Sequence, residues 1–379
     1  MKIERLGAEH YDEILALLNA VFGRKNGKEM NFELEMPKMC ARDDEHMSKH
    51  FGIFDGGRLV ACMSVYPFDA FVFGKHLKFA TTGNVAVHWD YEGRGYMGAI
   101  LDYAMSEVER LDIDVARLGG LRSRYNRYGF EACGQGYNFT FTDKNREKKM
   151  RNYNSDLIFK EITPSDTEWL AFSAKLYNSN GIYVPRDGEN IYKSLTMWRN
   201  IPYIAFSGDT PIGYLSAKNG GDIAEAFGID IKALGDVICS WQKRCACSVR
   251  FSLEAHQLDA IRLFSAVCES FSLDSPSHFK ICNFEKTVDA FLKLKASYQS
   301  LPSGEVCIGI EDYGTIRLVV DGKDAFCEHT EKSADITLDK LSAHRYLFGP
   351  YSPSYTAEAS YLAEAWLPLP LSWNGQDRV

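Results

Sequence analysis

Apolar and polar residues recur along this chain with two periods, and each period predicts a type of element. Alternation at every second residue predicts strands, and apolar residues three or four apart predict helices. In residues 11–22, for example, Ile14, Leu17, Leu18 and Val21 lie on one helical face. The elements predicted for the first 150 residues are strands at 3–6, 51–54, 58–66, 71–73, 76–80, 82–87 and 114–118, a strand ending near 141, and helices at 11–22 and 95–110.

A similar order of elements returns in the second part of the chain. Its predicted elements are strands at 157–162, 203–206, 212–216, 222–227 and 248–253, a helix at 165–176, and helices ending at 243 and 268. A third group follows residue 280, with helices at 284–296 and ending at 346 and strands at 305–310, 315–320, 324–328 and 334–338. The second group has no glycine loop after its strand at 222–227.

The charged run at 143–151 is typical of a linker between folded units. We therefore divide the chain into units at 1–150, 151–279 and 280–379. Strands and helices mixed in each unit predict an α+β (α/β) fold, in which mixed central sheets are flanked by helices. The polar, weakly periodic stretch at 23–42 predicts a loop or short helices that cover a substrate site.

Composition narrows the classes of partner. The 379 residues carry a formal net charge of -8, with a pI of about 5.7. This balance argues against nucleic acid as a main partner, because phosphate binding needs a basic face. A negative surface suits a cationic amine substrate, but it also keeps a protein in solution, and the second explanation carries more weight.

Ten cysteines are scattered through predicted strands and helices, without the CxxC spacing of zinc sites. The N-terminal residues lack the apolar stretch of a signal peptide. No apolar run reaches the roughly 18 residues that span a membrane. We therefore expect reduced thiols, no membrane span and a cytoplasmic protein.

Residues 84–100, NVAVHWDYEGRGYMGAI, carry the strongest chemical signal. A strand is predicted to end at Val87 and a helix to begin at Gly95. Gly93 and Gly95 let the backbone approach a ligand closely. The free N–H groups and positive dipole end of that helix suit a pyrophosphate, and Arg94 would add a charge-assisted contact.

This strand–loop–helix string resembles motif A of the GNAT acetyltransferases: an Arg or Gln, two residues, Gly, one residue, then Gly or Ala. Glu92 stands at the Arg or Gln position and Met97 at the second Gly position. With a bulky residue at this position, the string resembles that of the enhanced-intracellular-survival (Eis) branch of these enzymes. The resemblance implies acetyl-CoA as co-substrate and no metal, with the pantetheine arm on the backbone of residues 85–87 and the pyrophosphate at residues 93–98. The residues assigned in this way are Val85, Ala86, Val87, Gly93, Arg94, Gly95, Tyr96, Met97 and Gly98.

A second string, RYNRYGF at 124–130, resembles the GNAT pattern of a Tyr four residues before a Gly-Phe pair. Tyr125 occupies this place, and the resemblance implies that it is the general acid for the departing CoA thiolate. We expect Tyr128 to pack instead. A phenol has a pKa of about 10 and a thiol of about 8.5, so this proton transfer is uphill unless the site shifts one of them.

The resemblance to the Eis branch extends over the whole chain. Members have an active GNAT unit, a second GNAT-like unit without a cofactor loop, and a third unit similar to sterol carrier proteins. Segments 305–310 and 333–339 fit the third unit. The resemblance implies tandem GNAT folds followed by a sterol-carrier-like α/β domain, and a homo-oligomer that in this branch is a ring-like hexamer.

The chemistry implied is direct attack of an amine on the thioester, for which proximity supplies much of the rate. An alkyl ammonium has a pKa of about 10.4, so a base must remove its proton first. In the Eis branch this base is the chain's own C-terminal carboxylate, and the matching group here is the α-carboxylate of Val379. The alternative is a frayed, solvated terminus.

Three histidines, His46, His50 and His88, are given structural interpretations. Asp43, His46 and His50 have helix-compatible spacing, for which a solvated helix face is favoured over a metal site. His88 lies beside the cofactor strand and is expected to shape the turn.

The acidic residues Glu29, Glu33 and Glu35 lie in the stretch predicted to cover the substrate. They would attract a cationic amine, or they form a solvated charge run. We predict an acetyl-CoA-dependent N-acetyltransferase acting on a primary amine, with aminoglycoside or protein-lysine acceptors implied by resemblance. The alternative is a catalytically inactive carrier of acyl-CoA or lipid.

Overall fold

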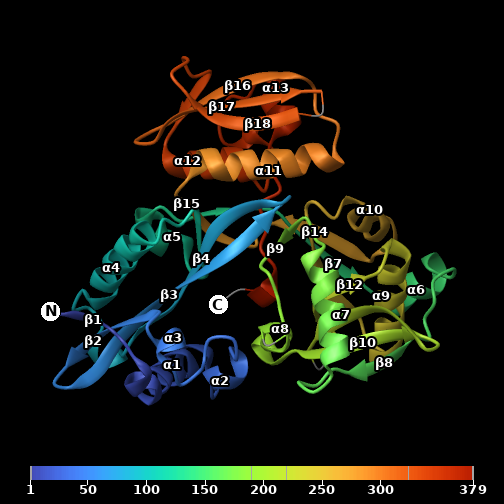
Figure 1. Ribbon diagram of the computed structural model, residues 1–379, viewed down its shortest axis with the longest axis horizontal. Helices are drawn as coiled ribbons and strands as arrows, with labels where there is room; N and C mark the ends of the chain where they lie inside the picture. Colours follow the sequence, from blue (N-terminus) through green and yellow to red (C-terminus); the bar gives the residue numbers. More distant parts are fainter. Residues whose placement is uncertain (1, 189, 219, 323, 378–379) are drawn as a thin grey trace.

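The computed structural model describes residues 2–188, 190–218, 220–322 and 324–377. Figure 1 shows an N-terminal unit and a second unit side by side, with a third unit lying across both. The end of the described chain leaves the third unit and runs down between the first two (Figure 1). This path brings the C-terminal segment to the junction of the two larger units.

The first unit is a mixed sheet with the order β1-β2-β3-β4-β5-β15-β6. Helix α4 packs on one face through Ile100, Leu101, Ala104 and Val108, all fully buried at the apolar spacing predicted for this helix. The elements are β1 (Ile3–Arg5), η1 (Ala8–His10), α1 (Tyr11–Asn26), α2 (Phe32–Glu35), α3 (Asp44–Met47), β2 (His50–Asp55), β3 (Arg58–Val72), β4 (Lys75–Val87), η2 (Trp89–Tyr91), α4 (Tyr96–Arg110), β5 (Val115–Leu118), α5 (Arg122–Tyr125), η3 (Asn126–Tyr128) and β6 (Glu131–Cys133).

Strands β3 and β4 form one long hairpin, and each of them merges two strands that the sequence analysis predicted as separate. The predicted strand ends at Tyr66, directly before Pro67, a residue type that strand interiors disfavour. In the structure Pro67 lies in β3 opposite Ala80 of β4. Pairing with β2 ends at Ser64 and pairing with β9 begins at Phe71. Proline is therefore tolerated, because β4 is the one described strand that borders β3 at this point.

The second unit contains two sheets, ordered β12-β11-β10-β8 and β13-β7-β14. Its elements are β7 (Gly136–Phe141), α6 (Asp143–Lys149), β8 (Ile158–Glu161), α7 (Thr167–Asn178), β9 (Ile182–Tyr183), α8 (Asn190–Leu195), η4 (Met197–Arg199), β10 (Ile201–Ser207), β11 (Thr210–Ala217), β12 (Ile223–Gly228), α9 (Ile231–Cys245), β13 (Val249–Glu254), α10 (Leu258–Val267), β14 (Ser270–Asp274) and β15 (Ser277–Ile281).

The two units exchange strands. β7 follows β6 in sequence but pairs with β13 and β14 of the second unit. β15, in return, inserts between β5 and β6 of the first. The predicted division at 150 and 279 therefore does not follow the sheets: residues 136–141 belong to the second unit's sheet and residues 277–281 to the first.

The charged run predicted as a linker is largely the helix α6, so this prediction was wrong. Thr142 caps the helix, with a reciprocal pair of contacts to Asn145. Arg146 turns inward and donates to Gln242 of α9 at 2.7 Å. A charged linker and a surface helix can have the same composition. The N-cap residue Thr142, three residues before Asn145, was the local sign of a helix.

The third unit pairs β18-β17-β16-β19 in a sheet, with β16 and β19 parallel. Figure 1 shows α11 running along the side that faces the other two units. Its elements are α11 (Phe284–Tyr298), β16 (Gly304–Ile310), β17 (Gly314–Asp321), β18 (Asp324–Thr330), β19 (Ile336–Leu338), α12 (Lys340–Phe348), η5 (Pro353–Tyr355) and α13 (Tyr361–Trp366), followed by η6 (Gly375–Asp377). The predicted class, mixed sheets flanked by helices in tandem, is confirmed, and the likeness of the third unit to sterol carriers stays a prediction.

Candidate functional site

Strands β4 and β5 run parallel and then separate, which opens a cleft in the first sheet. Their pairing extends from Phe79 opposite Val115 to Thr82 opposite Leu118, where β5 ends. β4 continues to Val87, paired from there on only with β3. Asn84 has a φ of 56° at an irregularity in that pairing. The backbone of residues 83–87 therefore presents a free edge to the cleft.

Helix α4 begins at the mouth of this cleft with its first N–H groups uncapped. Gly93 and Gly95 have φ values of 77° and 80°, in the left-handed region that favours glycine. A Cβ at either position would meet no atom within 4 Å, so the backbone conformation, not crowding, requires glycine there. Gly95 is the N-cap and has no side chain to accept from the first turn. The loop is thus shaped to accept an anion on its amides.

The matching place in the second unit is closed. Helix α9 follows β12 as α4 follows β4, but its N-cap is Asp230, whose carboxylate accepts from Ala233 N at 2.7 Å. A Cβ at Gly228 would lie 2.3 Å from Leu234 N, so loop and helix are in contact. A side-chain anion already fills the site that α4 leaves open, so of these two helix starts in the described chain only that of α4 offers an anion site.

A cavity of about 1460 Å³ lies over the start of α4. It is lined by most of the residues predicted to bind the cofactor: Val85, Val87, Gly93, Gly95, Tyr96, Met97 and Gly98. Glu92 also lines it. Ala86 points to the opposite side of β4, where its side chain is buried in the cluster around α1. Only the backbone of Ala86 is left to contact a ligand in the cleft.

Arg94 lies outside the residues that line this cavity. Its guanidinium pairs with Asp55 at 3.2 Å and lies over the ring of Tyr91. Other basic residues line the cavity instead: Arg24, Lys25, Arg124 and Arg127. The sequence analysis assigned none of these four to the cofactor, although Arg24 and Lys25 closely follow the predicted first helix and Arg124 and Arg127 stand in the RYNRYGF string.

A second cavity of about 570 Å³ adjoins the first. Six residues line both cavities: Phe22, Lys25, Val85, Gly120, Leu121 and Arg124. The second cavity reaches across to β12 of the second unit and to Gln376 near the end of the described chain. Two connected cavities meeting at the β4–β5 separation can hold two substrates with their reactive ends together.

Tyr125 lines the second cavity beside this junction. Its side chain is 4% exposed, and its ring lies against Gly120, where a Cβ would come within 2.8 Å of Cε2. Burial raises the pKa of Tyr125, and the neighbouring Arg124 offsets part of the rise. The phenol is therefore protonated at neutral pH. Tyr128 lines the first cavity and receives a hydrogen bond from Arg127 at 2.6 Å.

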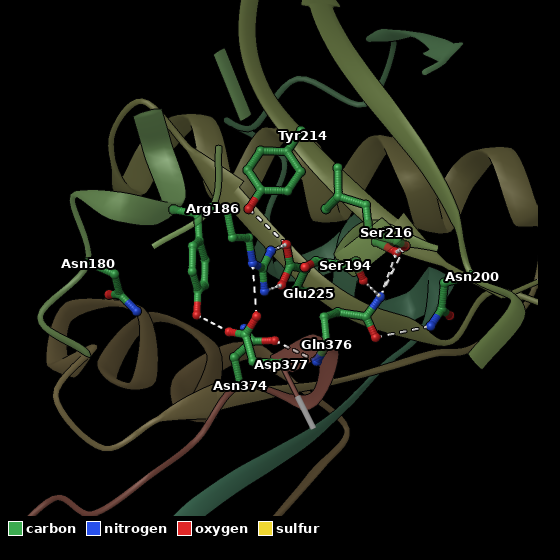
Figure 2. A network of polar contacts seen from close by, with 12 residues as sticks. Asn180, Arg186, Ser194, Asn200, Tyr214, Ser216, Glu225, Asn374, Gln376 and Asp377 are labelled. Atoms are coloured by element: carbon green, nitrogen blue, oxygen red, sulfur yellow. Dashed lines mark hydrogen bonds and ion pairs between the residues drawn. The ribbon is translucent and has the colours of Figure 1, made fainter. Parts of the chain in front are cut away.

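The end of the described chain is held by a buried charge network from three parts of the molecule. Figure 2 shows Asp377 facing Arg186, which in turn faces Glu225. Arg186 donates to Asp377 from Nε at 3.1 Å and to Glu225 from Nη1 at 2.7 Å and Nη2 at 3.0 Å. Lys38, from the stretch predicted as a cover, approaches Asp377 at 3.4 Å. Tyr177 also donates to Asp377.

The formal charges of this network sum to zero, because two cations, Lys38 and Arg186, face two carboxylates, Asp377 and Glu225. Burial alone would raise the pKa of Asp377, but the charges of Arg186 and Lys38 outweigh burial and hold it below its usual range. The Tyr214 hydroxyl completes the shell of Glu225 at 2.8 Å. A buried ion pair is stable only when its remaining hydrogen-bonding positions are filled in this way.

Gln376 fixes the tail beside the cavity through its amide. Its Nε2 donates to Leu195 O at 3.0 Å, to Ser194 O at 3.2 Å and to Ser216 Oγ at 3.2 Å. Its Oε1 accepts from Asn200 Nδ2 at 3.2 Å, as Figure 2 shows. Val379 lies outside the described residues, so its carboxylate is not located, but the chain is anchored at the cavity by Gln376, three residues before it.

Asp43 and His46 belong to a helix turn as predicted, but His50 does not share a solvated helix face with them, because it begins strand β2 and is buried. Asp43 caps the short helix α3 and contacts His46 at 2.7 Å. Burial lowers the pKa of His50 to about 4. His88 accepts from Asp90 N at 3.3 Å within the turn after β4. In the described part of the chain, no three His, Cys, Asp or Glu side chains gather as a metal site would require. Nor does any helix in that part combine the length and apolarity of a membrane span.

The acidic residues of the predicted cover lie away from both cavities. Glu33 accepts from the Tyr11 hydroxyl, and Glu35 pairs with Arg199 at 2.8 Å. Glu29 is exposed and lines neither cavity. The stretch does line the second cavity, through the apolar Met30, Phe32 and Met36 together with Lys25 and Asn26.

Residues 2–133 match the acetyltransferase (GNAT) domain family. The whole chain is similar in fold to a probable N-acyltransferase from Enterococcus faecalis V583 (16% identity, TM-score 0.68, 97% of this chain and 98% of that chain). It is also similar to a GCN5-related N-acetyltransferase from Anabaena variabilis ATCC 29413 (16%, 0.66, 98% and 98%) and to Eis1 from Mycobacterium abscessus (14%, 0.63, 99% and 98%). The search of curated proteins found no match.

Proposed function

We propose that this protein is an acetyl-CoA-dependent N-acyltransferase of the Eis type that transfers an acyl group to a primary amine. One observation carries the proposal: the uncapped start of α4 opens into a cavity that meets a second cavity beside Tyr125. The GNAT match over residues 2–133 supports acyl transfer as the class of reaction. The ten free cysteines fit the cytoplasm that the sequence predicts.

In this proposal acetyl-CoA lies in the larger cavity. The N–H groups of residues 93–98 receive the pyrophosphate, and the free edge of β4 at Val85, Ala86 and Val87 pairs with the amides of the pantetheine arm. Arg24 and Arg127 are placed to meet phosphate charge in the same cavity. The thioester would then reach Val85 and Gly120, where the two cavities join.

The reaction is direct attack. A base takes one proton from the acceptor ammonium, and the nitrogen lone pair forms a bond to the thioester carbonyl carbon. The C–S bond then breaks, the thiolate takes the Tyr125 hydroxyl proton, and the second nitrogen proton returns to that phenolate through water. The products are the amide and free CoA, with one proton released to solvent. We propose the α-carboxylate of Val379 as the base, supported by the anchoring of Gln376 and Asp377 beside the cavity.

Removing Arg378 and Val379 should lower kcat about 100-fold, because general base catalysis contributes roughly 10²–10⁴-fold. The KM for acetyl-CoA should stay within about twofold, since the cofactor loop is untouched. Thiol release on a reactive amine measures both. Val379→Ala, which keeps a terminal carboxylate at the same position, is the matched control and should retain activity. Unchanged turnover in the truncated protein would exclude this base.

Gly98→Asp tests the cofactor site. A carboxylate in the first turn of a helix stabilises it, and a Cβ at Gly98 would make only ordinary contacts, with Arg127 at 3.6 Å. The same carboxylate repels a pyrophosphate by about 3 kcal/mol at the effective dielectric of a partly exposed site. Acetyl-CoA affinity should therefore fall about 100-fold in isothermal titration.

Gly98→Ala is the control, since it adds the Cβ without the charge, and it should bind within about threefold of the wild type. Equal binding by the wild type and Gly98→Asp would place the coenzyme elsewhere. Wild-type protein that binds acetyl-CoA but transfers no acyl group to any amine would favour the inactive carrier instead.

A further inference from the structure

The second cavity, where the amine acceptor would lie, is lined in part by large apolar side chains. Those from the first unit include Phe22, Met30, Phe32 and Met36. The rings of Phe22 and Phe32 form a tilted pair with centroids 5.2 Å apart. Trp198, in η4 of the second unit, adds a third ring to this lining. An apolar part of a substrate would therefore meet side chains from both units.

Trp198 has a backbone conformation that a large side chain rarely adopts. Its φ is 61° and its ψ is 30°, and the next residue, Arg199, has a φ of 58°. Both residues are in the left-handed region, where a Cβ costs free energy. Such strain persists only where the surroundings hold it, and it gathers at ligand clamps and active sites. A tryptophan held in this way beside a cavity indicates a role for its ring there.

Three contacts hold the turn that carries this tryptophan, and each leads to an element of the proposed site. Met197 is fully buried in the apolar cluster that includes residues of α1 and α2. Arg199 pairs with Glu35 of α2 at 2.8 Å. Asn200 donates to Gln376 Oε1 at 3.2 Å, which joins the turn to the C-terminal tail (Figure 2). The ring is thus placed relative to the first unit and to the tail together.

The lining of this cavity offers a single carboxylate among the described residues, and that carboxylate is already paired. Asp222 binds Arg250 through both oxygens, at 3.0 and 2.6 Å. Lys25 and Lys218 also line the cavity and would repel additional ammonium groups. The proposed base, the carboxylate of Val379, would serve one amine. A polycation such as an aminoglycoside would leave its other ammonium groups unpaired, so the cavity favours an acceptor with one amine.

The volume of the cavity suits an apolar arm. It measures about 570 Å³, whereas a cavity of about 150 Å³ holds benzene. We infer that the acceptor is a primary amine with a single ammonium group on an apolar arm, aromatic or long alkyl, and that Trp198 determines the specificity for this arm. Phe32 and Met36 contact the same arm. The inference rests on the proposed function, because it names the substrate class of the same site.

A series of amines tests the substrate class in the full-length protein. Phenethylamine and hexylamine carry an apolar arm, ethylamine has the same primary amine without the arm, and kanamycin is a polycation. In thiol-release assays with acetyl-CoA, the kcat/KM of each amine with an arm should be about tenfold or more above that of ethylamine, as burial of an apolar group provides. Kanamycin should have a lower kcat/KM than phenethylamine and hexylamine.

Trp198→Gly tests the specificity residue, since it removes the ring and glycine suits the left-handed backbone. The preference for phenethylamine over ethylamine should fall about tenfold through KM. The kcat for ethylamine and the affinity for acetyl-CoA should stay within about twofold. Trp198→Asn, which also tolerates this backbone, should lose the preference in the same way. Phe73→Gly is the matched control, because Phe73 has a φ of 47° and is exposed outside the lining of either cavity. It should keep the preference.

The outcomes separate this inference from the function on which it rests. Equal use of ethylamine and the amines with an arm would overturn it and leave acyl transfer intact. A preference for kanamycin, or a preference for phenethylamine that survives both Trp198 variants, would do the same. Wild-type protein that does not bind acetyl-CoA, or that acylates no amine, would instead contradict the proposed function.

Discussion

Tyr125→Phe should lower kcat about 100-fold, within the range for loss of a general acid, and leave acetyl-CoA affinity within about twofold. The expectation follows from the place of the side chain. Tyr125 is buried at the junction of the two cavities, with its ring against Gly120. Phenylalanine keeps the ring and its packing and removes only the proton that the departing thiolate would take.

The pH profile gives this prediction a second readout. Because burial raises the pKa of Tyr125, the wild-type phenol should stay protonated beyond the usual value of about 10. No loss of kcat from its ionisation is expected below that pH. The same rise in pKa makes proton donation by Tyr125 harder, so the C–S bond should be largely broken, with negative charge on the sulfur, before the proton is transferred. Stopped thiol-release assays from pH 6 to 10 measure both effects.

Tyr137→Phe provides the control, since burial also raises the pKa of Tyr137 but it lies on β7, outside the residues that line either cavity. It should leave kcat unchanged. Retention of full activity by Tyr125→Phe would exclude a catalytic proton on this phenol and reduce Tyr125 to a packing residue.

Asp377→Asn should release the C-terminal tail. Removing one charge from a buried pair costs roughly 3–5 kcal/mol, because the partner is left uncompensated. Here Arg186 and Lys38 would both lose their shared carboxylate. The tail can leave as a unit, so the cost should appear as local opening and not as global unfolding.

Hydrogen exchange and limited digestion by a carboxypeptidase measure that opening. Digestion of Asp377→Asn should be about 100-fold faster or more, and kcat should fall with it, while acetyl-CoA binding is retained. Arg262→Gln, which breaks the exposed pair with Asp259, is the control and should change neither. A tail that stays protected in Asp377→Asn would show that the charge network does not hold it.

The sign of the pH effect on the tail follows from the same pair. The pKa of Asp377 is held below its ordinary value of about 3.9, so the pair contributes stability above that pH. That contribution is lost as the pH falls through the lower pKa of the folded state. The tail should therefore stay docked across the neutral range and loosen only in acid.

Local signals predicted the cofactor loop from the sequence. A strand ending at Val87, two glycines and a helix start lie within ten residues, and the two positive φ values at Gly93 and Gly95 agree with the reason for expecting glycine. The predicted contact of Arg94 with the pyrophosphate could not be judged from local signals. The side chain pairs with Asp55, which lies 39 residues away at the end of strand β2. A side chain's direction depends on such distant neighbours, which composition does not reveal.

Long-range pairing decided what the sequence did not predict. β7 and β15 each pair outside the group in which they were placed, since strands carry no local mark of their partner. The network around Asp377 joins residues up to 339 positions apart. The sequence analysis assigned no role to Arg186 or Glu225, and it is the fold that buries them together.

A crystal structure of the protein with CoA tests the central claim most directly. It should show the pyrophosphate oxygens within hydrogen-bond distance of the N–H groups of residues 93–98, with the sulfur near Val85 and Tyr125. A coenzyme bound at another place, or a loop whose amides are turned away from it or blocked by Glu92, would contradict the account.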